Sequence, residues 1–364
     1  AIISPLLSGI ADYVGNKKNF MKFFCYLGGI SCIGLYWFTL DTLLVGLVFY
    51  FLGVIGFWVS FAMNNSYLPD IAFPEQQDRL SAKGFSLGYI GSVILLLVNL
   101  AMVLSPDTFG IVDTAGEPAE ILAMKYSFVS VGVWWILFSQ YTFYHLPKGY
   151  RRGGGRTRII FNGFRELQGV WRQLRDLPVL KRYLGAFFVY SMAVQTVMLI
   201  AAYFGEEEIA WGTDSERTTG LIVSILVIQL VAVAGATLTA RASKAFGNIP
   251  TLGVINALWV VICIYAYFVR QPMEFYIAAG CVGLVMGGIQ ALSRSTYSKL
   301  MPETTDTTSF FSFYDVAEKI GIVIGMSIFA LVAQMNNSMR PAALMLGVFF
   351  LLGIFLLLRV RVKK

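Results

Sequence analysis

Long apolar runs separated by short polar segments are the main pattern of this 364-residue chain. A helix that crosses the hydrocarbon core of a bilayer needs about 20 mostly apolar residues. Measured against that length, the chain opens with an apolar stub at 1–10 and continues with ten predicted transmembrane helices. These helices are predicted at 21–38, 42–63, 84–104, 126–146, 183–204, 219–240, 251–269, 274–294, 310–333 and 341–359.

The positions of the basic residues predict how the helices are oriented. Of 28 Lys and Arg residues, 23 fall in segments that alternate helices would place on one side: 11–22, 64–83, 147–182, 241–250, 294–309 and 359–364. Cytoplasmic segments of membrane proteins are enriched in Lys and Arg. We therefore expect the segment 147–182 and the C-terminus to be cytoplasmic.

Composition agrees with this assignment and excludes several classes of function. Hydrophobic residues make up 57% of the chain and charged residues 13%, whereas soluble domains carry about 25% charged residues. The fold class is therefore all-α integral membrane, and the net charge of +7 reflects topology, so no nucleic-acid partner is expected. The four cysteines lie in apolar runs and His145 is the only histidine. We expect no metal, no cofactor and no catalytic residues, so an enzyme is not predicted.

The segment 147–182 separates the first four of the ten helices from the last six. We expect an N-terminal bundle at 1–146, a cytoplasmic linker at 147–182 and a C-terminal bundle at 183–364. Within the linker, apolar residues recur at helical spacing between arginines, which indicates a basic amphipathic helix on the anionic inner leaflet. A nucleic-acid or calmodulin-like partner is the alternative. The apolar residues are Ile160, Phe164, Leu167, Trp171 and Leu174.

A short degenerate repeat supports two related halves. Residues 8–16 read Ser-Gly-Ile-Ala-Asp-Tyr-Val-Gly-Asn, and residues 240–248 read Ala-Arg-Ala-Ser-Lys-Ala-Phe-Gly-Asn, each after an apolar helix. Many transporters are built from such internal repeats. The second copy has Lys244 where the first has Asp12.

The first copy resembles the loop motif of the major facilitator superfamily, Gly-x-x-x-Asp-x-x-Gly-x-Lys/Arg, which joins the second and third helices. Ser8 replaces the first glycine, whereas Asp12, Gly15 and Lys17 match. The resemblance implies two pseudo-symmetric six-helix bundles, with the first helix missing from this chain. Asp12, Lys17 and Lys18 would act as a gate latch. An ordinary basic cytoplasmic turn is the alternative.

A more specific resemblance lies at 287–297, Gly-Gly-Ile-Gln-Ala-Leu-Ser-Arg-Ser-Thr-Tyr, and 310–319, Phe-Phe-Ser-Phe-Tyr-Asp-Val-Ala-Glu-Lys. These stretches resemble the branch that contains the fungal autophagy-related vacuolar amino-acid effluxer and its bacterial relatives. The resemblance implies secondary transport of a small solute. It suggests amino-acid export, with a proton or another ion as the coupling partner. We expect a monomer in the lipid bilayer of the bacterial inner (plasma) membrane.

The segment 315–319 places three ionisable groups within a predicted transmembrane helix. A charge at the centre of such a helix costs about 2.5–3.5 kcal/mol on insertion scales, so these groups need partners or water. Asp315 and Lys319 are spaced to pair on one helix face. Glu318 or Asp315 would then be a proton or substrate site. The alternative is a self-neutralised cluster that closes the cytoplasmic gate.

Other polar residues within the helices are candidates for the transport pathway. Arg294 could bind a substrate carboxylate or serve as a positive anchor, but we expect an ion pair with Asp315 or Glu318. Uncharged residues would line the cavity or bond between helices: Tyr190, Gln195, Gln229, Asn256 and Gln290. Close helix approach is expected at three Gly-x-x-x-Gly pairs: 84/88, 283/287 and 321/325.

Transport is favoured over two other functions. A non-transporting receptor or scaffold that reuses the fold is the main alternative, and a membrane enzyme is a distant third. A scaffold gains nothing from the insertion cost of the charged residues at 315–319, whereas a transporter uses such residues.

Overall fold

The computed structural model describes residues 7, 10, 16–114, 116–147, 159–304 and 306–360. Ten helices in this described part are long and apolar enough to cross a membrane, and each matches one predicted span. They are α2 (Lys17–Gly34), α3 (Leu43–Asn65), α5 (Pro74–Leu104), α6 (Ala119–His145), α8 (Pro178–Glu208), α9 (Asp214–Phe246), α10 (Asn248–Phe268), α11 (Pro272–Leu300), α12 (Thr307–Asn336) and α13 (Met339–Leu358).

Shorter helices connect some of these spans. They are the 3₁₀ turns η1 (Leu35–Trp37) and η2 (Pro106–Phe109), and the helices α4 (Leu68–Ile71) and α7 (Ile159–Arg175). Residues 11–15 of the predicted loop motif, including Asp12 and Gly15, lie outside the described residues.

The helix α5 begins ten residues before its predicted start at 84. Pro74 occupies its first turn, where a missing backbone N–H costs nothing because no carbonyl precedes it in the helix. The apolar run records only the part of a helix that lies in hydrocarbon. The polar residues 74–83 therefore extend α5 instead of forming a loop.

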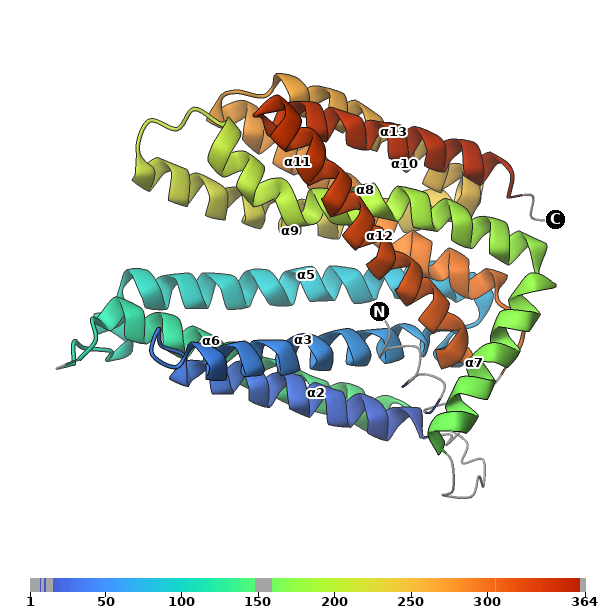
Figure 1. Cartoon of the computed structure of the whole chain (residues 1–364), viewed down its shortest axis with the longest axis horizontal. Helices are drawn as coiled ribbons and strands as arrows, with labels where there is room; N and C mark the ends of the chain where they lie inside the picture. Colours follow the sequence, from blue (N-terminus) through green and yellow to red (C-terminus); the bar gives the residue numbers. More distant parts are fainter. Residues whose placement is uncertain are drawn as a thin grey trace.

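Two groups of helices lie side by side (Figure 1). One contains α2, α3, α5 and α6, and the other contains α8 to α13. The larger group has its own buried apolar core, whose largest fully buried side chain is Trp259. A smaller core around Met63 and Tyr67 joins α2, α3 and α6. We call these groups the first bundle and the second bundle.

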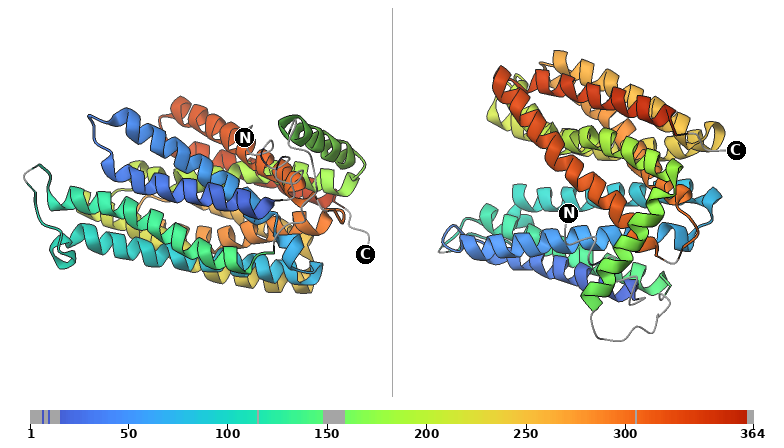
Figure 2. Two further views of the ribbon diagram at one scale, coloured as in Figure 1. Left: turned by 90° about the horizontal axis from the view of Figure 1, so that it is seen from below. Right: turned by 45° about the vertical axis from the view of Figure 1, so that its right-hand side comes forward.

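The two bundles touch along α5 and at the end of α12. The helix α5 packs against α9 and α11 of the second bundle. The helix α12 lies obliquely, and its N-terminal end reaches the first bundle (Figures 1 and 2). The helix α7 spans the same end of both bundles. We call that end the linker side and the other end the opposite side.

Part of the apolar face of α7 packs on protein. Val170 and Leu174 are buried with the core of the second bundle, and the Trp171 ring lies 5.7 Å from the Phe313 ring. Trp171 itself remains half exposed. This helix therefore has one edge that packs against the second bundle.

Glycines allow two pairs of helices to approach closely. A Cβ added to Gly287 would overlap the carbonyl oxygen of Ala232 on α9, and one on Gly325 would overlap the Thr196 hydroxyl on α8. By contrast, a Cβ on Gly88 would meet nothing within 4 Å. The pair 84/88 is thus not a helix-packing motif, because Gly84 and Gly88 line a cavity.

Candidate functional site

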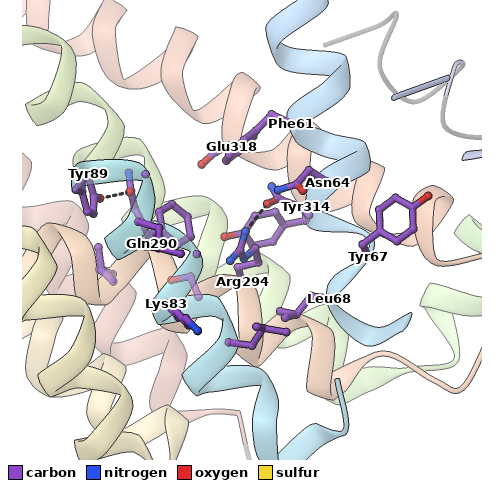
Figure 3. Close-up of a pocket in the computed structure, with 18 of the residues that line it drawn as sticks. Phe61, Asn64, Tyr67, Leu68, Lys83, Tyr89, Gln290, Arg294, Tyr314 and Glu318 are labelled. Atoms are coloured by element: carbon purple, nitrogen blue, oxygen red, sulfur yellow. Dashed lines mark hydrogen bonds between the residues drawn. The ribbon is translucent and has the colours of Figure 1, made fainter. Parts of the chain in front are cut away.

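A cavity of about 730 Å³ lies between the two bundles. The first bundle contributes α3, α4, α5 and the end of α6, and the second bundle contributes α8, α11 and α12. Aromatic rings form much of its wall, among them Phe57, Trp58, Phe61, Phe85, Tyr89, Phe187, Tyr190 and Tyr314. Figure 3 shows Glu318, Arg294, Gln290 and Lys83 around one space.

Glu318 is the acidic residue among those that line this cavity. Gln195 on α8 donates a hydrogen bond to its carboxylate at 2.6 Å. The bond joins α8 to α12, and both side chains remain partly accessible from the cavity. Two residues predicted for the pathway are therefore brought together here.

Gln290 also faces the cavity, and the oxygen and nitrogen of its side-chain amide contact residues of different bundles. Its side-chain oxygen accepts a hydrogen bond from the Tyr89 hydroxyl on α5 at 2.7 Å (Figure 3). Its nitrogen lies 3.0 Å from the Met198 sulfur on α8. Gln290 thus both lines the cavity and bonds between helices, the two roles that were left open.

Tyr190 belongs to a buried polar group at the cavity wall. Its hydroxyl lies 2.7 Å from the Ser293 hydroxyl and 3.3 Å from that of Tyr183, which donates to the Ser293 carbonyl at 2.8 Å. Tyr190 is only 1% exposed. It fixes α8 against α11 and offers the cavity mainly an aromatic surface.

The expected ion pair of Arg294 is wrong. Its guanidinium donates to the Ser81 hydroxyl at 3.0 Å, the Ser81 carbonyl at 3.2 Å and the Asn65 side-chain oxygen at 2.9 Å. It also lies 4.6 Å from the Phe85 ring centroid. No ion pair with Asp315 or Glu318 occurs among the described residues. Arg294 therefore joins α11 to α3 and α5 through neutral groups.

Asp315 and Lys319 pair on one face of α12, as their spacing predicted. Neither residue lines the cavity, and Asp315 is only 3% exposed. The Lys319 ammonium lies 4.1 Å from the Trp58 ring centroid on α3, so it also touches the first bundle. Of the three ionisable residues at 315–319, only Glu318 faces the cavity.

Asn256 does not line the cavity. It is fully buried in the second bundle, where its side-chain nitrogen donates to the Leu252 carbonyl of its own helix at 2.7 Å. Gln229 is outside the cavity lining as well, and it accepts a hydrogen bond from Ser92 on α5. Gln229 therefore bonds between helices, which is the second of its two predicted roles, whereas Asn256 bonds within its own helix. Polarity within a span does not specify the face on which the side chain lies.

Lys17 joins the two bundles on the linker side. Its ammonium forms an ion pair with Asp70 at 2.6 Å and donates to the Ser66 carbonyl at 3.1 Å, both in the first bundle. It also donates to the Thr307 hydroxyl, at the first residue of α12, at 3.0 Å. Lys18 instead donates to the Leu146 carbonyl at 2.6 Å, within the first bundle.

The ring of Tyr67 covers this group. The Lys17 ammonium lies 4.1 Å from its centroid. Burial and the nearby Asp70 carboxylate raise the pKa of the Tyr67 hydroxyl above its ordinary value. The ring therefore stays neutral and acts as a cation–π partner of Lys17.

A second polar cluster joins the bundles around Asp78, near the start of α5. Its carboxylate accepts hydrogen bonds from Lys299 at 2.6 Å, Asn248 at 2.9 Å and Ser243 at 3.0 Å. All three donors belong to the second bundle. Ser243 and Asn248 lie in the second copy of the sequence repeat, and Lys17 directly follows the first copy, so contacts between the bundles on the linker side lie in or beside the two copies.

Sequence reasoning missed Lys83 and Asp78. Both were assigned to the loop 64–83, whereas α5 already begins at Pro74. Lys83 therefore lies about 13 Å along the helix from that first residue and lines the cavity. The Phe-Pro dipeptide at 73–74 was the available signal, because proline is favoured in the first turn of a helix.

The whole chain matches a known protein family. The family model described as "Vacuole effluxer Atg22 like" matches residues 1–364. The uncharacterized MFS-type transporter YxiO of Bacillus subtilis (strain 168) is 30% identical over 357 residues, which covers 98% of this chain and 80% of that protein. Autophagy-related protein 22-2 of Aspergillus oryzae is 23% identical over 449 residues, which covers 98% of this chain and 71% of that protein.

Solved structures share the same arrangement of helices. The E. coli fucose:proton symporter FucP has a TM-score of 0.73 at 15% identity, covering 99% of this chain and 88% of its own. The proton:xylose symporter XylE has a TM-score of 0.72 at 15% identity, covering 99% of this chain and 84% of its own. At this identity the likeness concerns the fold.

Proposed function

This chain belongs to the Atg22-like vacuole effluxer family of major facilitator transporters, and from this premise we propose that it moves a small solute through the cavity between its bundles. The observation that carries the proposal is that cavity, about 730 Å³ in volume and lined by both bundles. Its polar groups and aromatic walls resemble the lining of small-molecule sites. The transport is secondary, driven by an ion gradient or by the gradient of the solute.

The charges in the cavity support an amino acid as the solute. Glu318 supplies a negative group on α12, whereas Lys83 and Arg294 supply positive groups on α5 and α11. No ion pair occupies Lys83 or Glu318 among the described residues. A zwitterion can direct its ammonium to Glu318 and its carboxylate to Lys83 or Arg294 by charge-assisted hydrogen bonds. The aromatic walls would then cover an apolar side chain.

Alternating access explains the contacts on the linker side. Lys17 bonds to both bundles. Arg294 of the second bundle bonds to the first, and Asp78 of the first bundle bonds to the second. Breaking these three groups of bonds would free the linker side to open, while the packing within each bundle stays intact. With the linker and C-terminus in the cytoplasm of a bacterial cell, the linker side is the inner gate. The transporter would act as a monomer.

The position of Glu318 supports a proton gradient as the driving force. Glu318 is the acid that lines the cavity, and among the described residues only Gln195 donates to its carboxylate, which leaves one oxygen for a proton or a solute. A carboxyl group between helices that rock can load on one side and unload on the other.

Transport into proteoliposomes under an imposed pH gradient tests this proposal. Wild-type protein should move a labelled amino acid faster with the gradient than without it, and Glu318→Gln should transport at a rate that no longer depends on the gradient. Glu120→Gln, which removes an exposed acid at the start of α6, is the matched control and should behave like wild type. Unchanged proton dependence in Glu318→Gln would exclude the proton-carrier role. No transport of any solute would favour the receptor or scaffold function.

A further inference from the structure

A second hollow lies on the flank of the second bundle, apart from the central cavity. It has a volume of about 520 Å³ and is lined by Arg182 and Gly185 of α8 and by Leu356, Leu358 and Arg359 at the end of α13. The helices α8 and α13 pack side by side, so the hollow is a groove between them. We call it the α8–α13 groove.

The groove carries two arginines without acidic partners. Arg182 and Arg359 are both exposed, and neither forms an ion pair among the described residues. The Arg359 guanidinium lies 4.4 Å from the Phe355 ring centroid, which holds its stem against α13. A guanidinium presents a planar set of donors that matches phosphate oxygens, and it sheds water more easily than an ammonium.

The remaining walls of the groove are apolar. Leu358 is 73% exposed at the last residue of α13, and Leu356 lies beside it in the lining. A Cβ added to Gly185 would meet nothing within 4 Å, so the floor of the groove is open. Exposed apolar residues continue from the groove along α13: Phe355, Leu352 and Leu351.

The arrangement of the two arginines and the exposed leucines matches the polar head and the apolar chain of an amphiphile in a membrane. The arginines lie where α8 begins and α13 ends, at the linker-side boundary of the apolar spans, and the exposed leucines lie along the span itself. A ligand with an anionic head and acyl chains would satisfy both parts, whereas a free phosphate would leave Leu356 and Leu358 uncovered. Basic pockets between transmembrane helices on the cytoplasmic side bind anionic lipid head groups.

We propose that the α8–α13 groove binds an anionic phospholipid, with its phosphate between Arg182 and Arg359 and an acyl chain along α13. The bound lipid bridges the first turn of α8 and the last turn of α13, and so it stabilises the second bundle at the membrane boundary. The site does not depend on the transported solute or on proton coupling.

Native mass spectrometry of the purified protein with phosphatidylglycerol tests the site. Two surface arginines near an anionic lipid together contribute an affinity difference of about thirtyfold. Wild-type protein should retain phosphatidylglycerol in preference to phosphatidylcholine, and Arg182→Gln with Arg359→Gln should lower the affinity for phosphatidylglycerol about thirtyfold. Arg241→Gln is the matched control, because Arg241 is exposed on the linker side but outside the groove. It should retain the wild-type affinity.

Equal affinities of the double variant and wild type would overturn the proposal, as would an equal loss in Arg241→Gln, which indicates general charge attraction. Displacement of the lipid by glycerol phosphate at similar concentration would also overturn it, because the acyl chain would then contribute nothing. Arg182→Lys with Arg359→Lys keeps the charge and should retain most of the preference. Thermal unfolding in phosphatidylcholine confirms that each variant is folded before its bound phosphatidylglycerol is measured by mass spectrometry.

Discussion

Replacing Asp78 with asparagine should open the linker side. The carboxylate accepts three hydrogen bonds from the second bundle, and one donor is the Lys299 ammonium at 2.6 Å. Asparagine removes the charge and places an amide group where two acceptors stood. In a state with the bundles apart, Asp78 and Lys299 would face water. The substitution therefore destabilises the closed state and leaves the free energy of the open state nearly unchanged.

The size of this effect follows from the burial of the pair. The Asp78 side chain is 10% exposed and that of Lys299 is 24% exposed, so water screens the pair only in part. A hydrogen bond to a charged group contributes about 1.5–3 kcal/mol. A loss of about 2 kcal/mol would shift the equilibrium between closed and open states about thirtyfold.

Distances between spin labels on the linker side measure that equilibrium. Phe73 of the first bundle and Phe246 of the second bundle are 74% and 75% exposed and can be changed to cysteine after the four native cysteines are replaced by alanine. Asp78→Asn should increase the population of longer distances about thirtyfold relative to the shorter ones. Glu75→Gln removes an exposed acid from the same first turns of α5 and should leave the distribution unchanged. Equal distributions for Asp78→Asn and wild type would refute the gate function of this cluster.

Two further substitutions test the packing between helices and between bundles. Gly287→Ala places a Cβ against the Ala232 carbonyl and should cost about 1–3 kcal/mol, seen as a lower thermal unfolding temperature. Gly88→Ala, where the Cβ meets nothing, should leave that temperature unchanged or raise it slightly; equal effects would contradict the packing argument. Arg294→Lys keeps the charge but cannot reach Asn65 and Ser81 together, so the label pair at 73 and 246 should report more open protein, and an unchanged distribution would exclude a gate role for the guanidinium.

Features that depend on local periodicity could be predicted from the sequence. The ten spans follow from apolar runs of sufficient length, and the pairing of Asp315 with Lys319 follows from their spacing on one helix. The fold followed from two motifs that resemble a known family. All of these are properties of a single segment or of a short pattern.

Features that depend on the rotation and packing of helices could not be predicted. Ser81 and Asn65 carry no sequence signal as partners of Arg294, because neutral groups on distant helices become partners only after the bundles meet. Asn256 and Gln290 are both polar residues within spans, yet one faces its own bundle and the other faces the cavity. The early start of α5 moved Lys83 from a supposed loop into the cavity wall.

The central claim is that the cavity between the bundles is the path of the solute, and counterflow of a labelled amino-acid panel in proteoliposomes tests it most directly. Gly88 lines that cavity and has free space beside it, so Gly88→Trp should fill the path without disturbing the packing of the helices. Wild-type protein should exchange at least one amino acid, Gly88→Ala should exchange it at a similar rate, and Gly88→Trp, folded by thermal unfolding, should exchange none. Exchange by Gly88→Trp at the wild-type rate would contradict the account.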